Sequence, residues 1–219
     1  MKKIFSLFVF VFIVFEFNYS FAQTSADISL KKLIDGNDRY VAGNLIHQNQ
    51  NSQRRIEVAK KQKPFAIILT CSDSRVPPEI IFDQGIGDLF VIRTAGNVVD
   101  NVALGSIEYA AEHLGVPLLV VLGHERCGAV EATVKGGEAA GHIKSIVSLI
   151  ARAVDKVLPQ KGDVLENSVV QNVYNVVDDL QNSKPILSEL VHENKLKIIG
   201  ARYDLDDGKV NFYNATNNH

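Results

Sequence analysis

Two short segments of the sequence contain the side chains best suited to chemistry. Cys71 is followed by Asp73 and Arg75, and His124 is followed three residues later by Cys127. Thiolate and imidazole groups are the ligands that zinc prefers, and a catalytic zinc site takes three protein ligands and leaves a fourth position for water. Cys71, His124 and Cys127 therefore form a candidate zinc-binding set. The His-x-x-Cys spacing alone is weak evidence for such a site.

The amino terminus argues for a different role of the two cysteines. Lys2 and Lys3 precede an apolar stretch at residues 4–15, and small residues follow at 20–22. This pattern is typical of a secretory signal peptide at residues 1–22, and an uncleaved anchor is the alternative. Export would carry the protein to the periplasm, an oxidising compartment in which two cysteines are expected to form a disulfide.

Hydrophobic patterns predict the elements that position these residues. Short apolar runs with β-branched residues predict strands, which we place at residues 65–70, 89–92, 118–122, 195–201 and, after a hairpin signal, 210–213. Helical spacing predicts helices at residues 30–41, 52–61, 102–113, 129–135 and 169–180. Cys71 directly follows the first strand, and the segment with His124 and Cys127 follows the third.

The alternation of strands and helices predicts one α/β domain over residues 23–219. We expect three layers around a mainly parallel central sheet of four strands, with an antiparallel edge strand and an N-terminal helical arm. In open parallel sheets the chemistry lies beyond the carboxyl ends of the strands, where both candidate segments are expected. The amphipathic arm has no obvious place on such a domain, so we expect it to embrace a neighbouring chain.

The charge balance argues against nucleic acid as a partner. The chain has 23 basic and 25 acidic residues and a formal net charge of −2, and it contains no clustered basic stripe of the kind that binds a polyanion. We therefore expect no nucleic-acid partner and, after signal cleavage, no membrane association.

Taken together, the two segments resemble the paired signature of the β-class carbonic anhydrases. The runs that carry the resemblance are Cys-Ser-Asp-Ser-Arg at 71–75 and His-Glu-Arg-Cys at 124–127. The stretch at residues 62–130 is similar to that family throughout, including the runs at 90–97 and 105–110. The resemblance implies an exported zinc lyase that interconverts carbon dioxide and bicarbonate.

The resemblance also implies roles for the residues of the two segments. One zinc ion per chain would be held by Cys71, His124 and Cys127, and zinc-bound hydroxide would attack carbon dioxide. Asp73 would accept a hydrogen bond from the hydroxide while Arg75 keeps the carboxylate ionised and oriented. At lower pH, Asp73 could instead become the fourth zinc ligand of an inactive enzyme. An ordinary surface ion pair is the alternative interpretation of Asp73 and Arg75.

Five further residues are candidates for substrate binding, four by their match to family positions and one by its place at the start of a predicted helix. Phe90, Ala95 and Tyr109 match pocket-lining positions, some of which the partner chain contributes in a homodimer or homotetramer. Gln62 matches an amide that hydrogen-bonds bicarbonate, although a surface glutamine explains it equally well. Gly128 could present its backbone N–H to bicarbonate at the start of a helix, or it could serve only the turn.

Two rival functions fit parts of the same pattern. The zinc site would also suit hydrolysis of carbon disulfide or carbonyl sulfide, because the choice among these substrates depends on the shape of the pocket. A non-catalytic protein with a disulfide or a closed zinc site is the second rival. It would leave Asp73, Arg75 and His124 without a role.

Overall fold

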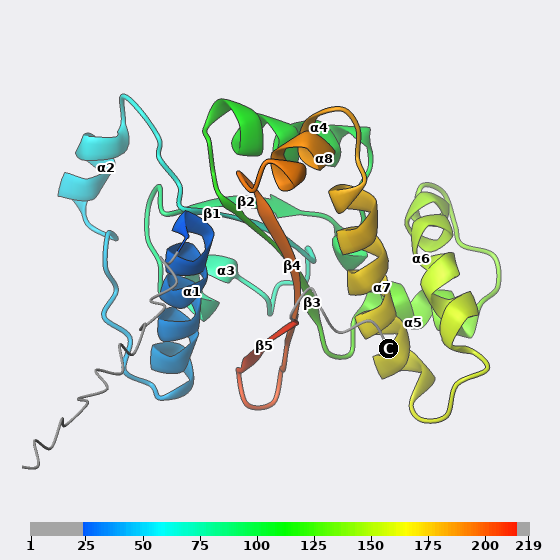
Figure 1. Cartoon of the computed structure of the whole chain (residues 1–219). Coiled ribbons are helices and arrows are strands. Elements are labelled where there is room, and N and C mark those ends of the chain that lie inside the picture. The colour runs from blue at the N-terminus through cyan, green and yellow to red at the C-terminus, as the bar shows by residue number, and fades with distance from the viewer. Residues whose placement is uncertain (1–23, 214–219) are drawn as a thin grey trace, which may run out of the picture.

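The structure, a computed structural model, describes residues 24–213 and contains one five-stranded sheet (Figure 1). The expected signal peptide at residues 1–22 lies outside the described residues. The strand order is β2-β1-β3-β4-β5. The strands are β1 (Ala66–Thr70), β2 (Leu89–Arg93), β3 (Leu118–His124), β4 (Lys197–Tyr203) and β5 (Val210–Tyr213). The first four are parallel and β5 is antiparallel to β4, which confirms the predicted sheet.

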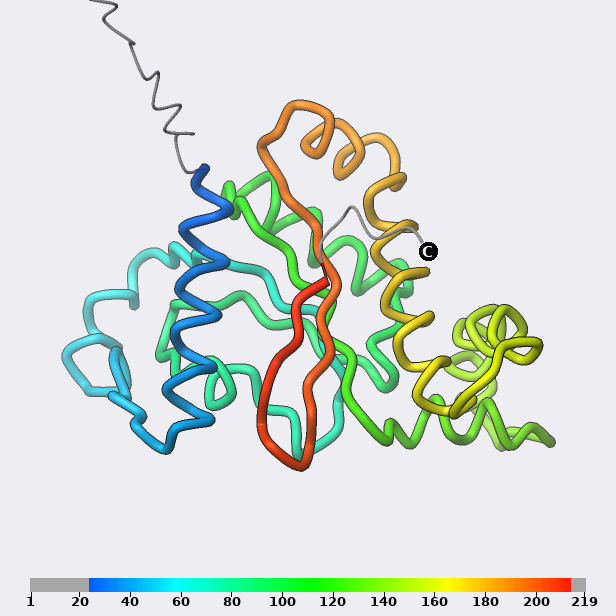
Figure 2. The backbone as a smooth tube through the Cα atoms, turned by 60° about the horizontal axis from the view of Figure 1, so that its bottom comes forward, coloured from blue at the N-terminus to red at the C-terminus, as the bar shows by residue number. Residues whose placement is uncertain are grey.

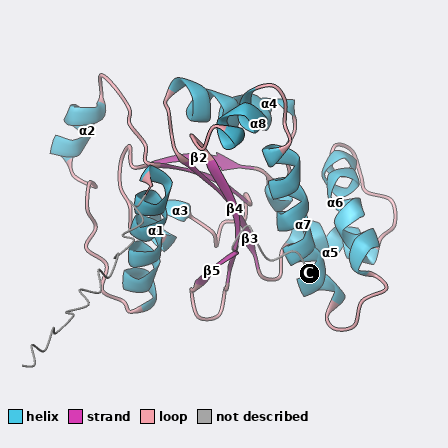
Figure 3. Cartoon of the chain, viewed as in Figure 1, coloured by secondary structure: helices cyan, strands magenta, loops and turns pink. Residues whose placement is uncertain are grey.

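Helices cover both faces of the sheet (Figure 3). They are α1 (Ser25–Val41), α2 (Ser52–Val58), α3 (Pro78–Ile81), α4 (Asn101–Glu108), α5 (Gly128–Lys135), α6 (Ile143–Val157), α7 (Val164–Gln181) and α8 (Ile186–His192). A short 3-10 turn, η1 (Ala95–Asn97), follows β2, and a π-helical turn, η2 (Tyr109–His113), continues α4. The sequence did not predict α3, α6 or α8.

The alternation of side chains along the strands divides the core into two layers. Successive residues of a strand point to opposite faces, so Ile67 and Leu69 of β1 pack under α4, α7 and α8, whereas Ile68 packs under α1 and α3. β1 and β3 are buried on both faces, which explains their continuous apolar runs. The core thereby holds the carboxyl ends of β1 and β3 in fixed positions.

The helix α1 packs against its own sheet, which corrects the expectation that the whole arm lacks a place on the domain. Leu33 of α1 is fully buried, and the Asn37 amide donates to the carbonyl oxygens of Ile81 and Gly208 and accepts from the Val210 amide. The bonds to Gly208 and Val210 join α1 to the β4–β5 hairpin, which runs beside it (Figure 2), and the bond to Ile81 joins it to α3. By contrast, α2 buries none of its residues. Within residues 24–213, no helix is long and apolar enough to span a membrane.

Candidate metal centre

The three candidate metal ligands meet at the carboxyl edge of two neighbouring strands. Cys71 directly follows β1, and His124 is the last residue of β3, which pairs with β1 in parallel. Cys127 is the N-cap residue of α5. Between them Arg126 has φ = 51°, and this left-handed turn redirects the chain from β3 into α5. The sheet topology therefore brings residues that are more than fifty positions apart in the sequence into one site.

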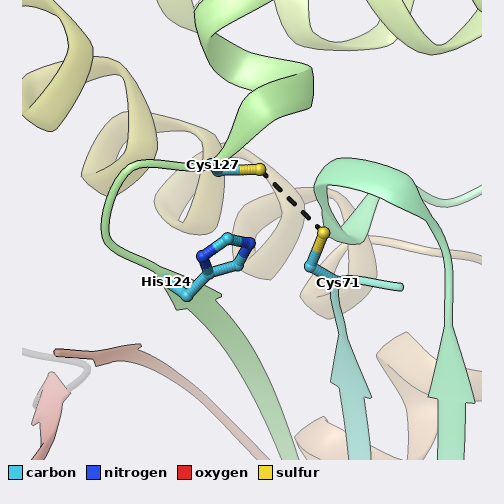
Figure 4. Close-up of side chains that lie close together, drawn as sticks. All are labelled: Cys71, His124 and Cys127. Atoms are coloured by element: carbon cyan, nitrogen blue, oxygen red, sulfur yellow. Dashed lines mark hydrogen bonds between the residues drawn. The ribbon is translucent and has the colours of Figure 1, made fainter. Parts of the chain in front are cut away.

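The distances among the ligands fit a metal ion and do not fit a disulfide. One ligand atom from each of Cys71, His124 and Cys127 lies within 4.8 Å of the others, and all three residues are buried. The two Sγ atoms face each other 4.0 Å apart, beside the His124 ring (Figure 4). A disulfide needs about 2.05 Å, whereas two thiolates on one tetrahedral zinc with bonds of about 2.3 Å lie about 3.8 Å apart. The geometry thus favours the metal interpretation of the cysteines.

The hydrogen bonding of His124 assigns the nitrogen that faces the site. Its Nδ1 atom lies 2.8 Å from the carbonyl oxygen of Glu125, so Nδ1 carries the proton and donates it to that oxygen. The buried Nε2 atom is then an acceptor, and it has no hydrogen-bond partner among residues 24–213. A buried polar atom without a partner is costly, and a metal ion would satisfy it. Ligating histidines are commonly oriented by such a bond from the second nitrogen.

The two thiols differ in their tendency to ionise. The Cys127 thiol donates to the sulfur of Cys71, which lowers the pKa of Cys71 and raises the pKa of Cys127. Burial opposes ionisation of Cys71, while the backbone N–H of Gly96, 3.2 Å from Sγ, favours it. Cys71 therefore loses its proton first, and it is already supplied with one backbone donor for its negative charge.

Asp73 and Arg75 form a close pair beside the ligands. The Arg75 side chain donates to both carboxylate oxygens of Asp73, at 3.0 and 2.8 Å, and its backbone N–H donates at 2.9 Å. These bonds lower the pKa of Asp73 to about 2. The same carboxylate lies 3.8 Å from Nε2 of His124. The structure thus brings the predicted pair together and places it next to the candidate metal position.

Arg93 also belongs to the site, although the sequence did not indicate a role for it. It ends β2 opposite Thr70 of β1, and its guanidinium donates from Nε to the carbonyl oxygen of Cys71 at 3.1 Å and from Nη2 to that of Asp73 at 2.6 Å. One side chain therefore holds the backbone on both sides of Ser72. Every residue has a main-chain carbonyl, so hydrogen bonds to these groups do not produce a sequence motif. The spacing of residue types therefore could not predict the two contacts of Arg93.

A second arginine secures the other ligand segment. Arg126 donates to both carboxylate oxygens of Asp206, at 2.9 and 2.6 Å, and Asp206 lies in the turn between β4 and β5. Asp206 also belongs, with Glu125 and Asp204, to a second group of acidic side chains close enough to hold a metal. Arg126 and Arg202 already pair with this group, so it is an ion-pair network.

The five predicted substrate-binding residues separate into two sets. Ala95 lies in η1 beside the start of α5, where Gly128 is exposed. Phe90 lies in mid-strand and packs against the half-exposed Tyr109, with ring centroids 6.2 Å apart. Gln62 is exposed before β1, whose five residues span roughly 16 Å to the ligand edge. Of the five predicted substrate-binding residues, Ala95 and Gly128 are the two that lie near the metal ligands of their own chain.

The fold and this site define an α/β enzyme class with a Cys-His-Cys metal centre at the carboxyl edge of a parallel sheet. A family model described as carbonic anhydrase matches residues 66–210. The chain is 43% identical over 194 residues to carbonic anhydrase 2 of Mycobacterium tuberculosis, covering 86% of this chain and 93% of the relative. It is 42% identical over 186 residues to the carbonic anhydrase of Mycolicibacterium smegmatis, covering 82% and 89%.

Solved structures show the same fold. One, from work on two tetrameric β-carbonic anhydrases of the ascomycete Sordaria macrospora, superposes with a TM-score of 0.67 at 26% identity, covering 86% of this chain and 98% of the other. The chain therefore belongs to the carbonic anhydrase family, in its β class of lyase enzymes.

Proposed function

We propose that the protein reversibly hydrates carbon dioxide to bicarbonate and a proton, with one zinc ion per chain held by Cys71, His124 and Cys127. The observation that carries this proposal is the buried Nε2 atom of His124, which lacks a hydrogen-bond partner among the described residues and belongs to a cluster with two sulfur ligands. When bound, zinc supplies a Lewis acid that lowers the pKa of its water ligand, so that hydroxide can attack carbon dioxide near neutral pH. Membership of the carbonic anhydrase family supports the same reaction.

In this proposal Asp73 orients the nucleophile and Arg75 orients Asp73. Because Arg75 lowers the pKa of Asp73 to about 2, the carboxylate stays ionised near neutral pH and can accept a hydrogen bond there. The bidentate contact with Arg75 fixes the direction of its oxygen atoms. In acid, Asp73 would leave Arg75 and serve as a fourth metal ligand, which would inactivate the enzyme. Its carboxylate lies 3.8 Å from Nε2 of the candidate ligand His124, which supports this second role.

We propose that the substrate pocket is shared between two chains. Gly128 would offer its backbone N–H to bicarbonate beside Ala95 of the same chain, while Gln62, Phe90 and Tyr109 would serve the site of a partner. The exposure of Gln62 and Tyr109 is consistent with this role. The relatives from Sordaria macrospora are described as tetrameric, which supports a homo-oligomer, a dimer or a tetramer, for this chain.

We also propose that the protein is exported and works in the periplasm. The proposal rests on the signal-peptide pattern of residues 1–22. Expression of the full chain in a bacterium, followed by mass spectrometry of the purified protein, should give a mature chain that begins at Gln23. Recovery of the intact amino terminus from the cytoplasm would contradict export without affecting the proposed reaction.

The reaction is tested by measuring zinc content and carbon dioxide hydration together. The wild-type chain is expected to hold one zinc ion and to be active, whereas His124→Ala and Cys71→Ser should lose both zinc and activity. His192→Ala is the matched control, because His192 is exposed on α8. Unchanged zinc content in His124→Ala would contradict the ligand assignment. Activity on carbon disulfide or carbonyl sulfide in place of carbon dioxide would favour the rival substrates.

A further inference from the structure

A buried asparagine of α7 contacts the segment that lines the candidate metal centre. Asn172 is 2% exposed and lies among the apolar residues of α7. Its side-chain Nδ2 donates to the carbonyl oxygen of Gly96 at 2.9 Å. The two residues are 76 positions apart in the sequence. Buried polar groups normally have such a partner. The partner of Asn172 Nδ2 belongs to η1, which lies beside Cys71.

Gly96 in turn donates to a metal ligand. Its backbone N–H lies 3.2 Å from Sγ of Cys71. Gly96 has φ = 68°, and a Cβ at this position would lie 2.7 Å from Cδ1 of Ile150. The left-handed backbone and this close approach both disfavour a side chain at this position. Asn172 and Cys71 thus contact the same glycine, one through its carbonyl oxygen and the other through its amide.

Val173, the residue after Asn172, sets the distance between α7 and the sheet. A Cβ on Gly123 would lie 2.5 Å from Cγ2 of Val173, and a Cβ on Gly200 would lie 2.7 Å from Cγ1 of the same residue. Only the absence of side chains at these two strand positions allows α7 to approach so closely. Gly123 immediately precedes His124. The contact that seats α7 therefore also places Asn172 at a defined position relative to the ligand-bearing strand.

We propose that Asn172 is a positioning residue for the metal centre, acting through Gly96 on the thiolate of Cys71. The inference rests on the proposed zinc-binding function of that centre. An N–H donor to a ligating sulfur holds the sulfur in place and withdraws part of its negative charge. Partners of this kind beyond the ligands tune metal affinity and the electrophilicity of the ion, and their loss typically weakens metal binding about 10- to 100-fold.

The same helix provides a control for a merely structural role. Asn175 lies one turn after Asn172 and is 4% exposed. Its Oδ1 accepts from Lys156 at 2.8 Å and from Gln171 at 3.0 Å, so its contacts lie on α6 and α7. Asn175→Leu removes a buried amide of the same type from the same helix. It should destabilise the fold without changing the metal centre.

The test compares Asn172→Leu with Asn175→Leu in two measurements on the metal itself. Zinc affinity is measured under reducing conditions by competition with a chromophoric chelator, and the thiolate-to-metal absorption band is recorded after cobalt substitution. We expect Asn172→Leu to bind zinc about 10-fold or more weakly and to shift the cobalt band. Asn175→Leu should retain the affinity and the band of the wild type. Equal effects of the two variants, or none from Asn172→Leu, would overturn the proposal.

A measurement on the wild type covers the case in which Asn172→Leu does not fold. In the cadmium-substituted protein, the hydrogen bond should give a through-bond coupling between the metal nucleus and the amide proton of Gly96. Absence of this coupling would overturn the inference. Failure of the wild type to bind zinc would instead contradict the proposed function, so the two failures are distinguishable.

Discussion

The carboxylate of Asp73 lies 3.8 Å from Nε2 of His124 while it accepts a hydrogen bond from Nη2 of Arg75 at 2.8 Å. Asp73 is thus held between a cation and the candidate metal position. Its pKa, lowered chiefly by Arg75, keeps it ionised over the neutral range. Arg75 therefore controls both the charge and the direction of the group that would orient the nucleophile.

This arrangement predicts that Asp73 and Arg75 act as one unit in catalysis. Asp73→Asn and Arg75→Gln should each lower kcat/KM by about 100-fold, the scale of a positioned proton acceptor. The double variant should have the same kcat/KM as the less active single variant, because each change removes the same orienting function of the pair. Steady-state kinetics with zinc content measured in parallel provide the check. Losses that multiply in the double variant would show that the two residues act separately.

Arg93 is predicted to act on turnover through the backbone of Cys71 and Asp73. Removing its two bonds to their carbonyl oxygens should misplace the carboxylate slightly, and Arg93→Gln should lower kcat/KM roughly 10- to 100-fold. Arg152→Gln is the control, since Arg152 also donates to a carbonyl oxygen, that of Asn175, but joins α6 to α7. Similar kinetics for the two variants would refute a special role of Arg93.

Asp83 is predicted to stabilise the fold in a pH-dependent way. Burial opposes its ionisation, but Arg39 and the backbone amides of Ile46 and His47 donate to it, and its pKa lies below the ordinary value of 3.8. A carboxyl with a lowered folded-state pKa contributes stability that is present above its unfolded pKa and is lost as pH falls through the folded value.

Asp83→Asn should therefore lower the free energy of unfolding by about 1.5–3 kcal/mol at neutral pH, and the difference from wild type should shrink as the pH falls below about 4. Asp35→Asn is the control, because the Lys31–Asp35 pair is exposed, and it should change stability by less than about 1 kcal/mol. Denaturant unfolding across the pH range gives both values. A difference that stays constant into acid would contradict the role assigned to the Asp83 charge.

Metal removal is predicted to expose the two cysteines to oxidation. Their sulfur atoms lie 4.0 Å apart, so a small movement brings them to disulfide distance once no metal holds them. Chelation followed by a mild thiol oxidant should give a Cys71–Cys127 disulfide that blocks zinc reloading until it is reduced. The zinc-loaded protein should resist the same oxidant. Equal rates of thiol loss with and without zinc would argue against these ligands.

The sequence sufficed for the parts of the protein that depend on local patterns. The buried runs of β1 and β3 predicted the sheet, and the rule for parallel sheets placed Cys71 and His124 at one edge. The helix α6 was not predicted, although Ile146, Ile150 and Val154 have the four-residue spacing of one helix face.

Other features depend on contacts that no local pattern records. Asn37 fixes α1 to the β4–β5 hairpin through two backbone groups and to α3 through a third. Arg93 and Asn172 act on carbonyl oxygens of distant segments. These interactions exist only after the sheet has brought the segments together. The roles of Gln62, Phe90 and Tyr109 depend on a second chain and stay predictions.

Zinc-dependent hydration of carbon dioxide can be measured by reloading metal-free protein with zinc in steps and following the reaction by stopped flow at each step. We expect the rate to rise in proportion to bound zinc and to level off at one ion per chain, with Asp73→Asn taking up zinc equally but remaining slow. A fully zinc-loaded, folded wild type that does not accelerate carbon dioxide hydration at any pH between about 6.5 and 9, the range in which a zinc-bound water ionises, would contradict the proposed function.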